Sequence, residues 1–466
     1  MLEESKAPEG DIIVSKFGGS SVASAEQIKK VGQIVKNDSG RKVVVVSAPG
    51  KDSSDSEKIT DHLINIATDG KHFLQQRKEI SAAESLKAVT DKFSGIIRDL
   101  GIDGEDILKG LKADLKKSLP ANMKIDFYAS RGEHYNSILI ARYLNSAGIQ
   151  AKTLLPEEIG FHVTEEFGNA KVIPISYKNI KKKILSEINS GLVVIPGFYG
   201  ITEKGDVAIF SRGGSDLTGG EIAYAVDASL YENWTDTDGI FQVDPRIISE
   251  ARVIPRLTYK EIRLLSSKGF NVFHYDAMVK CRKKHIPINI RNTNNPESEG
   301  TMIVSERVPQ ETVVGIARLD HIAYLYIEKN GSGETIGFVS RLLQIFKNFG
   351  IETYHYPTDR DDVSVILNQD DLVGCEDDLM EAISTELQPD IAELNYNITI
   401  LSAVGMGMKD HPGIIAEAAL AMKENNISIE IIDQGPAQYS FHFGVQNYYS
   451  DIALKALYDR LVAVHF

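Results

Sequence analysis

The sequence predicts an α/β protein, in which a mainly parallel sheet sandwiched by helices is followed by two smaller α+β domains. Three observations support this fold class. Apolar strands alternate with amphipathic helices over residues 11–305, glycine-rich loops stand between such elements, and residues 311–466 contain an internal repeat. Alternation of this kind is typical of parallel sheets whose strands are connected by helices.

The strands expected in the first part are continuous apolar runs rather than alternating ones. IIVS at 12–15, RKVVVVSAPG at 41–50 and GLVVIPGF at 191–198 are rich in β-branched residues, and the same alternation of helix and strand recurs in EIAYAVDASLYENWTD at 221–236. Strands that are buried on both faces have this composition. Residues 61–125 are instead charged and helical in pattern, which predicts a helical insertion or lobe.

The internal repeat is visible when the sequence is shifted by 76 positions. GFVSRLLQIFKNFGI at 337–351 then falls on GIIAEAALAMKENNI at 413–427, and residues 363–365 fall on 439–441 without a gap. Each copy has the pattern strand, loop, helix, strand, strand. Because the unit is long and occurs twice, it favours two packed α+β domains over a solenoid. We place them at 311–393 and 394–466 and expect a regulatory role.

Composition and charge exclude several classes of protein. The 466 residues are 42% hydrophobic and 25% charged, as in ordinary globular proteins. The net charge of −14 opposes general binding to nucleic acid or to acidic membranes. Two cysteines are too few for a disulfide framework or a cysteine-rich zinc site. No signal peptide or membrane span is predicted, so we expect a cytoplasmic protein.

Two glycine-rich loops are the first candidates for a functional site. In KFGGSS at 16–21, backbone amides at a helix amino terminus would approach an anion beside Lys16, although Gly-Gly also marks an ordinary turn. The Walker spacing is absent. In SRGGSD at 211–216, Arg212, Ser215 and Asp216 precede a helical pattern and would converge on one anion. Asp216 alone would equally make a good helix cap.

Two further segments allow both a structural and a functional interpretation. WTDTDGIFQVDPR at 234–246 follows an expected strand and is consistent with a turn or with a nucleotide site at the strand carboxyl ends. ASRGEHYNS at 129–137 places Glu133 in a loop before a helix. There the carboxylate would either cap the helix or hold an ammonium group, and the pattern alone leaves both alternatives open.

Together these motifs resemble those of the aspartate kinases in the amino-acid kinase family. The resemblance rests on KFGGSS, VVVVSAPG, the pair Gly132–Glu133, PGFYG at 196–200, SRGGSD and WTDTDGIFQVDPR, and it continues through EARVIP. The carboxy-terminal repeat resembles the two ACT domains of the same enzymes. The resemblance covers residues 11–466 and implies an amino-acid-kinase-type catalytic domain at 11–305.

The resemblance implies that ATP phosphorylates the β-carboxylate of L-aspartate to give 4-phospho-L-aspartate, the first step toward lysine, threonine and methionine. The residue types agree with this chemistry. A carboxylate is already ionised near neutral pH, so the main barrier is to bring it to an anionic phosphate. Cations and oriented amides lower that barrier.

Roles follow residue by residue from the resemblance. Lys16 would neutralise the transferring phosphoryl group, and the amides of Gly18 and Gly19 would support it. Asp216 would orient Lys16. The substrate would be bound by three side chains that match the family's pattern, namely Arg212 at the α-carboxylate, Glu133 at the ammonium group and Ser215.

The nucleotide would lie beside the segment WTDTDGIFQVDPR. The matching residues are Thr235, Asp236, Phe241 and Arg246, with Phe241 at a position where many relatives have Tyr. Mg²⁺ would be bound chiefly through the phosphates, and no metal ligands are predicted in the protein itself.

Two departures from the family pattern affect these assignments. A longer charged loop, KDSSDSEKITD at 51–61, replaces a compact Thr-Asn, and we assign the substrate role of that segment to Thr60. GFNVFHYDA at 269–277 replaces FGAKVLH, so that Asn271 stands where relatives have a phosphate-facing lysine. Lys280 or another cation would compensate, the nucleotide would be held differently, or activity would be reduced.

Two alternatives accompany the main hypothesis. One is a kinase for another acid, such as glutamate or N-acetylglutamate, although the spacing from PGFYG to DPR favours aspartate. The other is a non-catalytic amino-acid sensor with a decayed kinase domain. Asn271 supports the second alternative. Four retained residues argue against it, namely Lys16, Arg212, Asp216 and Asp236.

The paired ACT-like domains predict an amino-acid effector, for which we expect lysine, and a homodimer or a dimer of dimers formed through these domains. The residues that we expect at the effector are Gly337, Phe338, Val339, Ser340 and Asp359.

Overall fold

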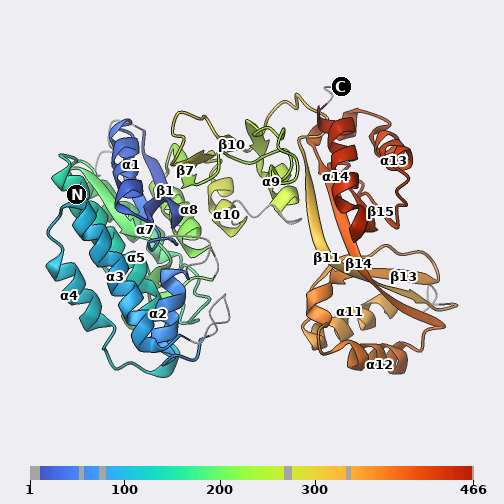
Figure 1. Ribbon diagram of the computed structural model, residues 1–466, viewed down its shortest axis with the longest axis horizontal. Helices are drawn as coiled ribbons and strands as arrows, with labels where there is room; N and C mark the ends of the chain where they lie inside the picture. Colours follow the sequence, from blue (N-terminus) through green and yellow to red (C-terminus); the bar gives the residue numbers. More distant parts are fainter. Residues whose placement is uncertain are drawn as a thin grey trace, which may run out of the picture. The chain divides into compact units, whose positions relative to one another are not determined.

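The computed structural model describes residues 11–51, 57–72, 80–211, 213–266, 275–331 and 337–463 (Figure 1). The chain forms two compact units. Unit 1 comprises the described parts of Met1–Ile240, Val253–Tyr259 and Asn271–Arg307, and unit 2 those of Phe241–Arg252, Lys260–Phe270 and Val308–Phe466. No helix among the described residues is long and apolar enough to cross a membrane. The domain boundaries that we expected remain predictions.

Unit 1 is built on an eight-stranded sheet with the order β3-β4-β2-β1-β7-β9-β10-β8. The first six strands run parallel to one another, and β10 is antiparallel to β9 but parallel to β8. The strands, in chain order, are β1 (Ile13–Phe17), β2 (Arg41–Val46), β3 (Ala151–Thr153), β4 (Leu192–Pro196), β7 (Leu230–Thr235), β8 (Arg256–Thr258), β9 (Ile288–Asn292) and β10 (Thr301–Val304). The predicted mainly parallel sheet is therefore confirmed.

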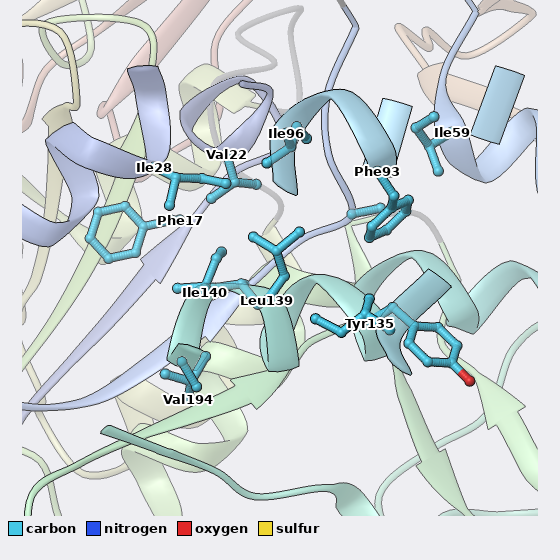
Figure 2. Packing of buried hydrophobic residues seen from close by; sticks show 14 of the residues in the cluster. Phe17, Val22, Ile28, Ile59, Phe93, Ile96, Tyr135, Leu139, Ile140 and Val194 are labelled. Atoms are coloured by element: carbon cyan, nitrogen blue, oxygen red, sulfur yellow. The ribbon is translucent and has the colours of Figure 1, made fainter. Parts of the chain in front are cut away.

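Helices cover both faces of this sheet. One face carries the helices that join β1 to β2 and β2 to β3, which are α1 (Ala25–Lys36), α2 (Ile59–Ala67), α3 (Ala82–Leu100), α4 (Glu105–Asp114) and α5 (Ala121–Ser146). The helical pattern expected over 61–125 is thus present. Figure 2 shows the core on this face, where side chains of β1, α1, α3 and α5 meet, among them Phe17, Ile28, Phe93 and Ile140.

On the other face, α8 (Gly214–Val226) packs against β1, β2 and β7, and α7 (Ile175–Glu187) and α10 (Tyr275–Lys283) pack against α8. Gly220 permits the close contact with α10, because a Cβ there would lie 2.3 Å from the carbonyl oxygen of Ala277. A hairpin of β5 (Tyr199–Ile201) and β6 (Val207–Ile209) and the short helix α6 (Pro156–Ile159) complete the connections of unit 1. The helix α9 (Tyr259–Ser266) follows β8 and, from Lys260 on, belongs to unit 2.

A buried carboxylate connects the central strands. Glu232 of β7 accepts hydrogen bonds from Ser15 Oγ of β1 at 2.8 Å and from two nitrogens of Arg41 of β2 at 2.8 and 2.9 Å. Trp234 Nε1 donates to the same carboxylate at 2.9 Å, and Arg291 of β9 lies 3.7 Å away. Burial alone would raise the pKa of Glu232, but the hydrogen bonds and charge of Arg41 lower it below its usual value.

Unit 2 shows the duplication in three dimensions. The strands β11 (Gly315–Glu328) and β14 (Ile391–Val404) coincide after a shift of 76 positions, and so do the first residues of α11 (Phe338–Phe349) and α13 (Ile414–Glu424). Each copy then continues with two strands, β12 (Thr353–His355) and β13 (Asp362–Asn368), or β15 (Ile431–Asp433) and β16 (Ser440–Gln446). Each ends in a helix that the sequence pattern did not predict, α12 (Glu376–Leu387) or α14 (Ser450–Tyr458).

The two copies share their long strands rather than standing end to end. β11 and β14 pair antiparallel along their length within a six-stranded sheet of order β12-β13-β11-β14-β16-β15. Figure 1 shows both strands running from the helices α13 and α14 to the helices α11 and α12. Each strand has an irregular register at an equivalent residue with positive φ, His321 at 58° and Asn397 at 59°.

On the two sides of these irregularities, each strand contributes side chains to a different hydrophobic core. Residues 316 and 401 pack in the core beneath α13 and α14, whereas residues 325 and 394 pack in the core beneath α11 and α12. The first core also receives Val243 and Ile248 from the segment 241–252. The predicted boundary at 393/394 falls inside β14.

Candidate active site

A cavity of about 620 Å³ lies in unit 1 outside the carboxyl ends of β1, β2 and β7. Ligands of open parallel sheets bind at this edge. The residues that line it come from the KFGGSS, SAPG, Gly132–Glu133, PGFYG, SRGGSD and WTDTDGIFQVDPR motifs and from the loop at 51–61. They are Lys16, Gly19, Ser20, Ser47, Ala48, Pro49, Gly50, Lys51, Lys58, Ile59, Thr60, Glu133, Phe198, Gly213, Gly214, Ser215, Asp216 and Asp236.

Lys16 and Asp216 form the buried ion pair of this cavity. Lys16 Nζ lies 2.5 Å from Asp216 Oδ1, and the side chains are 8% and 17% exposed. Asn233 Nδ2 donates to the same Oδ1 at 2.8 Å. Asn233 is the residue of β7 that stands opposite Lys16 of β1 in the parallel register. The ammonium group is therefore held in place by a carboxylate that is itself oriented by a neutral donor.

The structure decides against a helix cap at Asp216. The residue preceding α8 is Gly213, with a φ of 74°, and no side chain caps the helix there. Asp216 occupies the first turn, where a carboxylate is favoured by the helix dipole, and directs its side chain to Lys16.

The KFGGSS loop differs from the expected junction of strand and helix. A 3₁₀ turn over Ser20–Val22 follows the glycines, and α1 begins only at Ala25 behind the cap Ser24. The loop instead packs closely against the SAPG segment, since the Gly50 amide donates to the Gly19 carbonyl at 2.9 Å. A Cβ on Gly50 would lie 2.5 Å from that oxygen, so glycine is required for the contact. Gly18 donates its amide to the Trp234 carbonyl at 3.0 Å.

Glu133 lies inside the long helix α5, not in a loop before a helix as the sequence predicted. Gly132 allows α5 to pack closely against the segment that follows β2. A Cβ on Gly132 would lie 2.7 Å from the Cβ of Ala48 in that segment. Glu133 is 4% exposed, and its Oε2 has no hydrogen-bond partner among the described residues. Burial raises the pKa of Glu133 to about 8, although a backbone hydrogen bond from Ala48 and the charge of Lys16 oppose the shift.

The PGFYG segment contributes Phe198 to the lining of the same cavity. Phe198 has a φ of 78°, which is costly for a residue with a side chain. Two hydrogen bonds hold it, because its amide donates to Thr218 Oγ1 at 3.0 Å and its carbonyl accepts from Phe210 at 2.9 Å. A Cβ on Gly197 would lie 2.7 Å from Ser215 Oγ, so this glycine lets Ser215 approach the cavity.

Four cavity residues, Lys51, Lys58, Ile59 and Thr60, come from the loop at 51–61 that departs from the family pattern. Thr60 stands in the first turn of α2 and lines the cavity, as its assigned role requires. Lys51 and Lys58 line it too, and we had given them no role. Together with Asn233, they are the residues that sequence reasoning missed. The charged composition of the loop could have indicated that its lysines bind an anion. The position of Asn233 depends on strand register, and the sequence gives no sign of register.

The residues expected at the nucleotide are divided between the two units. Asp236 lines the cavity, and Thr235 Oγ1 donates to its Oδ1 at 3.0 Å. Phe241 packs against the core of unit 2. Arg246 also belongs to unit 2, where it is 88% exposed and forms an ion pair with Asp244 at 2.6 Å. Neither is among the residues that line the cavity.

Two assigned residues, Arg212 and Asn271, lie outside the described residues. Lys280, considered as a substitute for the missing lysine, lies on α10 with its Nζ 3.8 Å from Glu221 and 4.6 Å from the ring centre of Tyr177. It is not among the residues that line the cavity.

The residues expected at the effector lie around the start of α11 and the turn before β13. Gly337 precedes α11 with a φ of 85°, and Val339 and Ser340 are exposed on its first turn. Phe338 is 5% exposed and packs in the core beneath α11 and α12. Asp359 is exposed, and its Oδ1 accepts the amide of Arg360.

Comparison with known proteins agrees with this site. A model of the amino acid kinase family matches residues 11–292, and a model of an ACT domain matches residues 401–461. The chain therefore belongs to the amino acid kinase family. Aspartokinase 3 of Bacillus subtilis (strain 168) is 39% identical over 458 residues, which cover 97% of this chain and 98% of that protein. Within the family, this chain belongs with the aspartate kinases.

Solved structures give the same result. The crystal structure of aspartate kinase from Clostridium acetobutylicum has a TM-score of 0.84 and 34% sequence identity, covering 97% of this chain and all 100% of that one. Aspartokinase III of E. coli, solved in complex with aspartate and ADP, shares the fold with a TM-score of 0.74 at 21% identity, covering 97% and 100% of the chains.

Replacement of Asn233 tests how Lys16 is positioned. Asn233→Ala removes the donor that orients Asp216, so we expect kcat for phosphoryl transfer to fall about tenfold, equivalent to ~1.4 kcal/mol. KM for the acceptor should stay within about twofold, because this side chain does not line the cavity. Steady-state kinetics measure both.

The matched control is Asn145→Ala, which removes bonds of Nδ2 to the carbonyls of Ala141 and Ala151 at 2.9 and 2.7 Å near the end of α5 and does not line the cavity. Its kcat should match that of the unaltered chain. Equal kcat values for both variants would show that Asn233 does not position the ion pair.

Proposed function

We propose that this chain transfers the γ-phosphoryl group of ATP to the β-carboxylate of L-aspartate, which yields 4-phospho-L-aspartate and ADP. The observation that supports this most directly is the buried Lys16–Asp216 pair, which shares one cavity with a buried glutamate and two further lysines. Such a cavity offers cations for phosphate and an acid for an ammonium group. Aspartokinase III of E. coli, which has the same fold, has been solved in complex with aspartate and ADP.

The proposed reaction is a displacement at phosphorus. A β-carboxylate oxygen of aspartate forms a bond to the γ-phosphorus, the bond from phosphorus to the bridging oxygen breaks, and ADP leaves with that electron pair. No proton needs to be removed, because the nucleophile is already ionised. The role of Lys16 is to stabilise the charge on the transferring group, and the fixed position of its ammonium group avoids reorganisation during the reaction.

The nucleotide would lie on the side of the cavity formed by the KFGGSS loop and Asp236. Mg²⁺ would be bound chiefly through the phosphates. The carboxylates of Asp216 and Asp236 are oxygen donors of the kind this ion prefers, so the residues present fit it. When bound, the ion would neutralise charge on the phosphate oxygens.

Glu133 is proposed to bind the ammonium group of the substrate. Its Oε2 is buried and unpartnered among the described residues, so an incoming cation would supply the missing donor. Ionisation of a carboxylate with a raised pKa becomes favourable once a positive charge is adjacent. Thr60, Ser215 and, outside the described residues, Arg212 would bind the remainder of aspartate.

Activity with Lys16→Met tests the proposal. Without the ammonium group, we expect acyl phosphate formation to fall by about a hundred- to a thousandfold, the loss typical when one preorganised electrostatic contact is removed. Trapping with hydroxylamine, with ATP and Mg²⁺ present, measures the product from aspartate, glutamate and N-acetylglutamate separately.

Lys204→Met, at an exposed lysine paired with Glu165, serves as the control and should retain full activity. Turnover of glutamate or N-acetylglutamate in preference to aspartate would favour the alternative kinase. Amino-acid binding without any product would favour the sensor.

The difference in stability between Glu133→Gln and the unaltered chain should depend on pH. The pKa of Glu133 is raised from 4.5 to about 8, so the folded chain retains a proton that the unfolded chain releases between these values. Its contribution to stability is therefore present below pH 4.5 and lost as the pH rises through 8. Glutamine stays neutral at every pH. The melting temperature of the variant, relative to that of the unaltered chain, should therefore increase as the pH rises from 5 to 9.

Thermal melts of both proteins across this range measure the difference, which should grow by up to about 1.4 kcal/mol per pH unit. Glu165→Gln, at an exposed carboxylate, should show no such trend. A constant difference at all pH values would mean that Glu133 is ionised in the folded chain.

Unit 2 is proposed to bind an amino-acid effector, lysine, and to join chains into a homodimer or a dimer of dimers. The duplicated modules and the ACT match at 401–461 support regulation. The exposed carboxylate of Asp359 is suited to the side-chain ammonium of lysine. A cytoplasmic location is part of the same proposal.

Thermal shift with lysine, threonine and methionine tests the effector. Lysine should raise the melting temperature, since a ligand at one hundred times its Kd adds about 2.7 kcal/mol of stability. Asp359→Asn should reduce the shift, whereas Asp378→Asn, at an exposed carboxylate on α12, should leave it unchanged. A larger shift with threonine or methionine would replace lysine as the effector.

A further inference from the structure

Three side chains that are far apart in the sequence meet in unit 2. His355 is the last residue of β12, Asp433 is the last residue of β15, and His442 lies within β16. Their candidate ligand atoms, one from each residue, all lie within 4.8 Å of one another. The proposed reaction uses none of these groups, because they belong to unit 2 and do not line the cavity of unit 1.

We propose that these three residues bind a transition-metal ion of the Zn²⁺ type. Two imidazoles and one carboxylate form a donor set found in zinc sites that keep a fourth position for water. Imidazole favours zinc and its neighbours in the transition series, whereas Mg²⁺ and Ca²⁺ prefer all-oxygen donors. The site is therefore distinct in chemistry from the magnesium expected at the phosphates.

The ligand atoms are close to the arrangement that such an ion needs. Donor atoms at 2.0–2.2 Å from a tetrahedral zinc stand about 3.4 Å from each other. Asp433 Oδ2 already lies 2.8 Å from His355 Nδ1, and the ring centres of His355 and His442 are 4.6 Å apart. Small rotations of side chains, without movement of the strands, bring the three donors to one ion.

The burial of the residues suits a bound ion. His442 is 6% exposed, while the side chains of His355 and Asp433 are 19% and 35% exposed, so the cluster is largely enclosed but open on one side. The ring of His442 is oriented from behind, because Ser402 Oγ lies 2.7 Å from its Nδ1. A ring held in this way presents Nε2 to the metal, where Ser440 Oγ makes a longer contact of 3.4 Å.

The position of the cluster in the fold suggests what the ion would do. β12 and β15 are the two opposite edges of the six-stranded sheet, which in a flat sheet would be about 24 Å apart at 4.8 Å per strand. The irregularities at His321 and Asn397 bend the long strands, and the face opposite the helices encloses a small core that includes Ile366 and Ile400.

Tyr354 of β12 and Ile431 of β15 both pack against this small core, and His355 and Asp433, at the ends of the same two strands, are in direct contact. One ligand comes from the first copy of the repeat and two come from the second. The backbone joins the two copies through β11 and β14 but does not pair β12 with β15. A bound ion would link the copies at these two edge strands.

Metal binding by the whole chain tests this inference. The chain, stripped with a chelator and free of nucleotide and amino acids, is titrated with Zn²⁺ in competition with a chromophoric chelator. We expect one tight equivalent per chain, unaffected by millimolar Mg²⁺. Co²⁺ in place of zinc should give the visible absorption of a tetrahedral site, which adventitious binding to exposed residues does not give.

The variants His355→Gln and Asp433→Asn should each lower the affinity for Zn²⁺ at least tenfold. The control is His321→Gln, since His321 also faces a carboxylate, Asp370 at 3.8 Å, but is 70% exposed and is not part of the cluster. It should bind zinc as the unaltered chain does. Circular dichroism and aspartate kinase turnover confirm that each variant is folded, and both should be unchanged.

If the unaltered chain takes up no tight equivalent, or if both cluster variants retain its affinity, the site does not exist. The His355–Asp433 contact is then only a contact between an imidazole and a carboxylate. Because kinase turnover is measured in the same preparations, failure of the metal site is distinguished from failure of the proposed activity.

Discussion

The carboxylate of Glu232 determines the register on which the active site depends. It accepts hydrogen bonds from β1, β2 and its own strand β7, and it faces an arginine of β9, so one buried group connects four neighbouring strands. Removing one partner from such a buried pair costs about 3–5 kcal/mol, so a shifted register is strongly disfavoured. In the register observed, Ser15 stands opposite Glu232, and the next residue pair, Lys16 and Asn233, points to the other face.

The alternation of side chains between the two faces of β1 and β7 connects the register of the sheet with the position of the active-site residues in unit 1. The face that carries Lys16 and Asn233 receives the first turn of α8, where Asp216 completes the ion pair. The glycines of the surrounding loops act on the same geometry by removing side chains from close contacts, as at Gly50, Gly132 and Gly197. The cavity is thus preorganised by contacts that do not themselves touch the proposed substrates.

Much of the fold and part of the site followed from the sequence. Continuous apolar strands predicted the parallel sheet, and the repeat at 76 positions predicted two related modules, because burial and duplication leave direct traces in residue patterns. Lys16, Gly19, Thr60, Glu133, Ser215, Asp216 and Asp236 were all expected and do line one cavity. The final helix of each module was missed, and Glu133 was placed in a loop although α5 is continuous through it, since polar residues in a buried helix mask its apolar period.

The sequence by itself determined the family, the parallel sheet and the identity of the principal charged groups, because motifs and apolar runs are local. The tertiary structure alone decided which of these groups meet. It paired Lys16 with Asp216 and Asn233, placed Phe241 and Arg246 in the other unit, and brought His355, Asp433 and His442 together from three strands. Register, bends in the long strands and helix packing produce these contacts, and they depend on side chains that are distant along the chain.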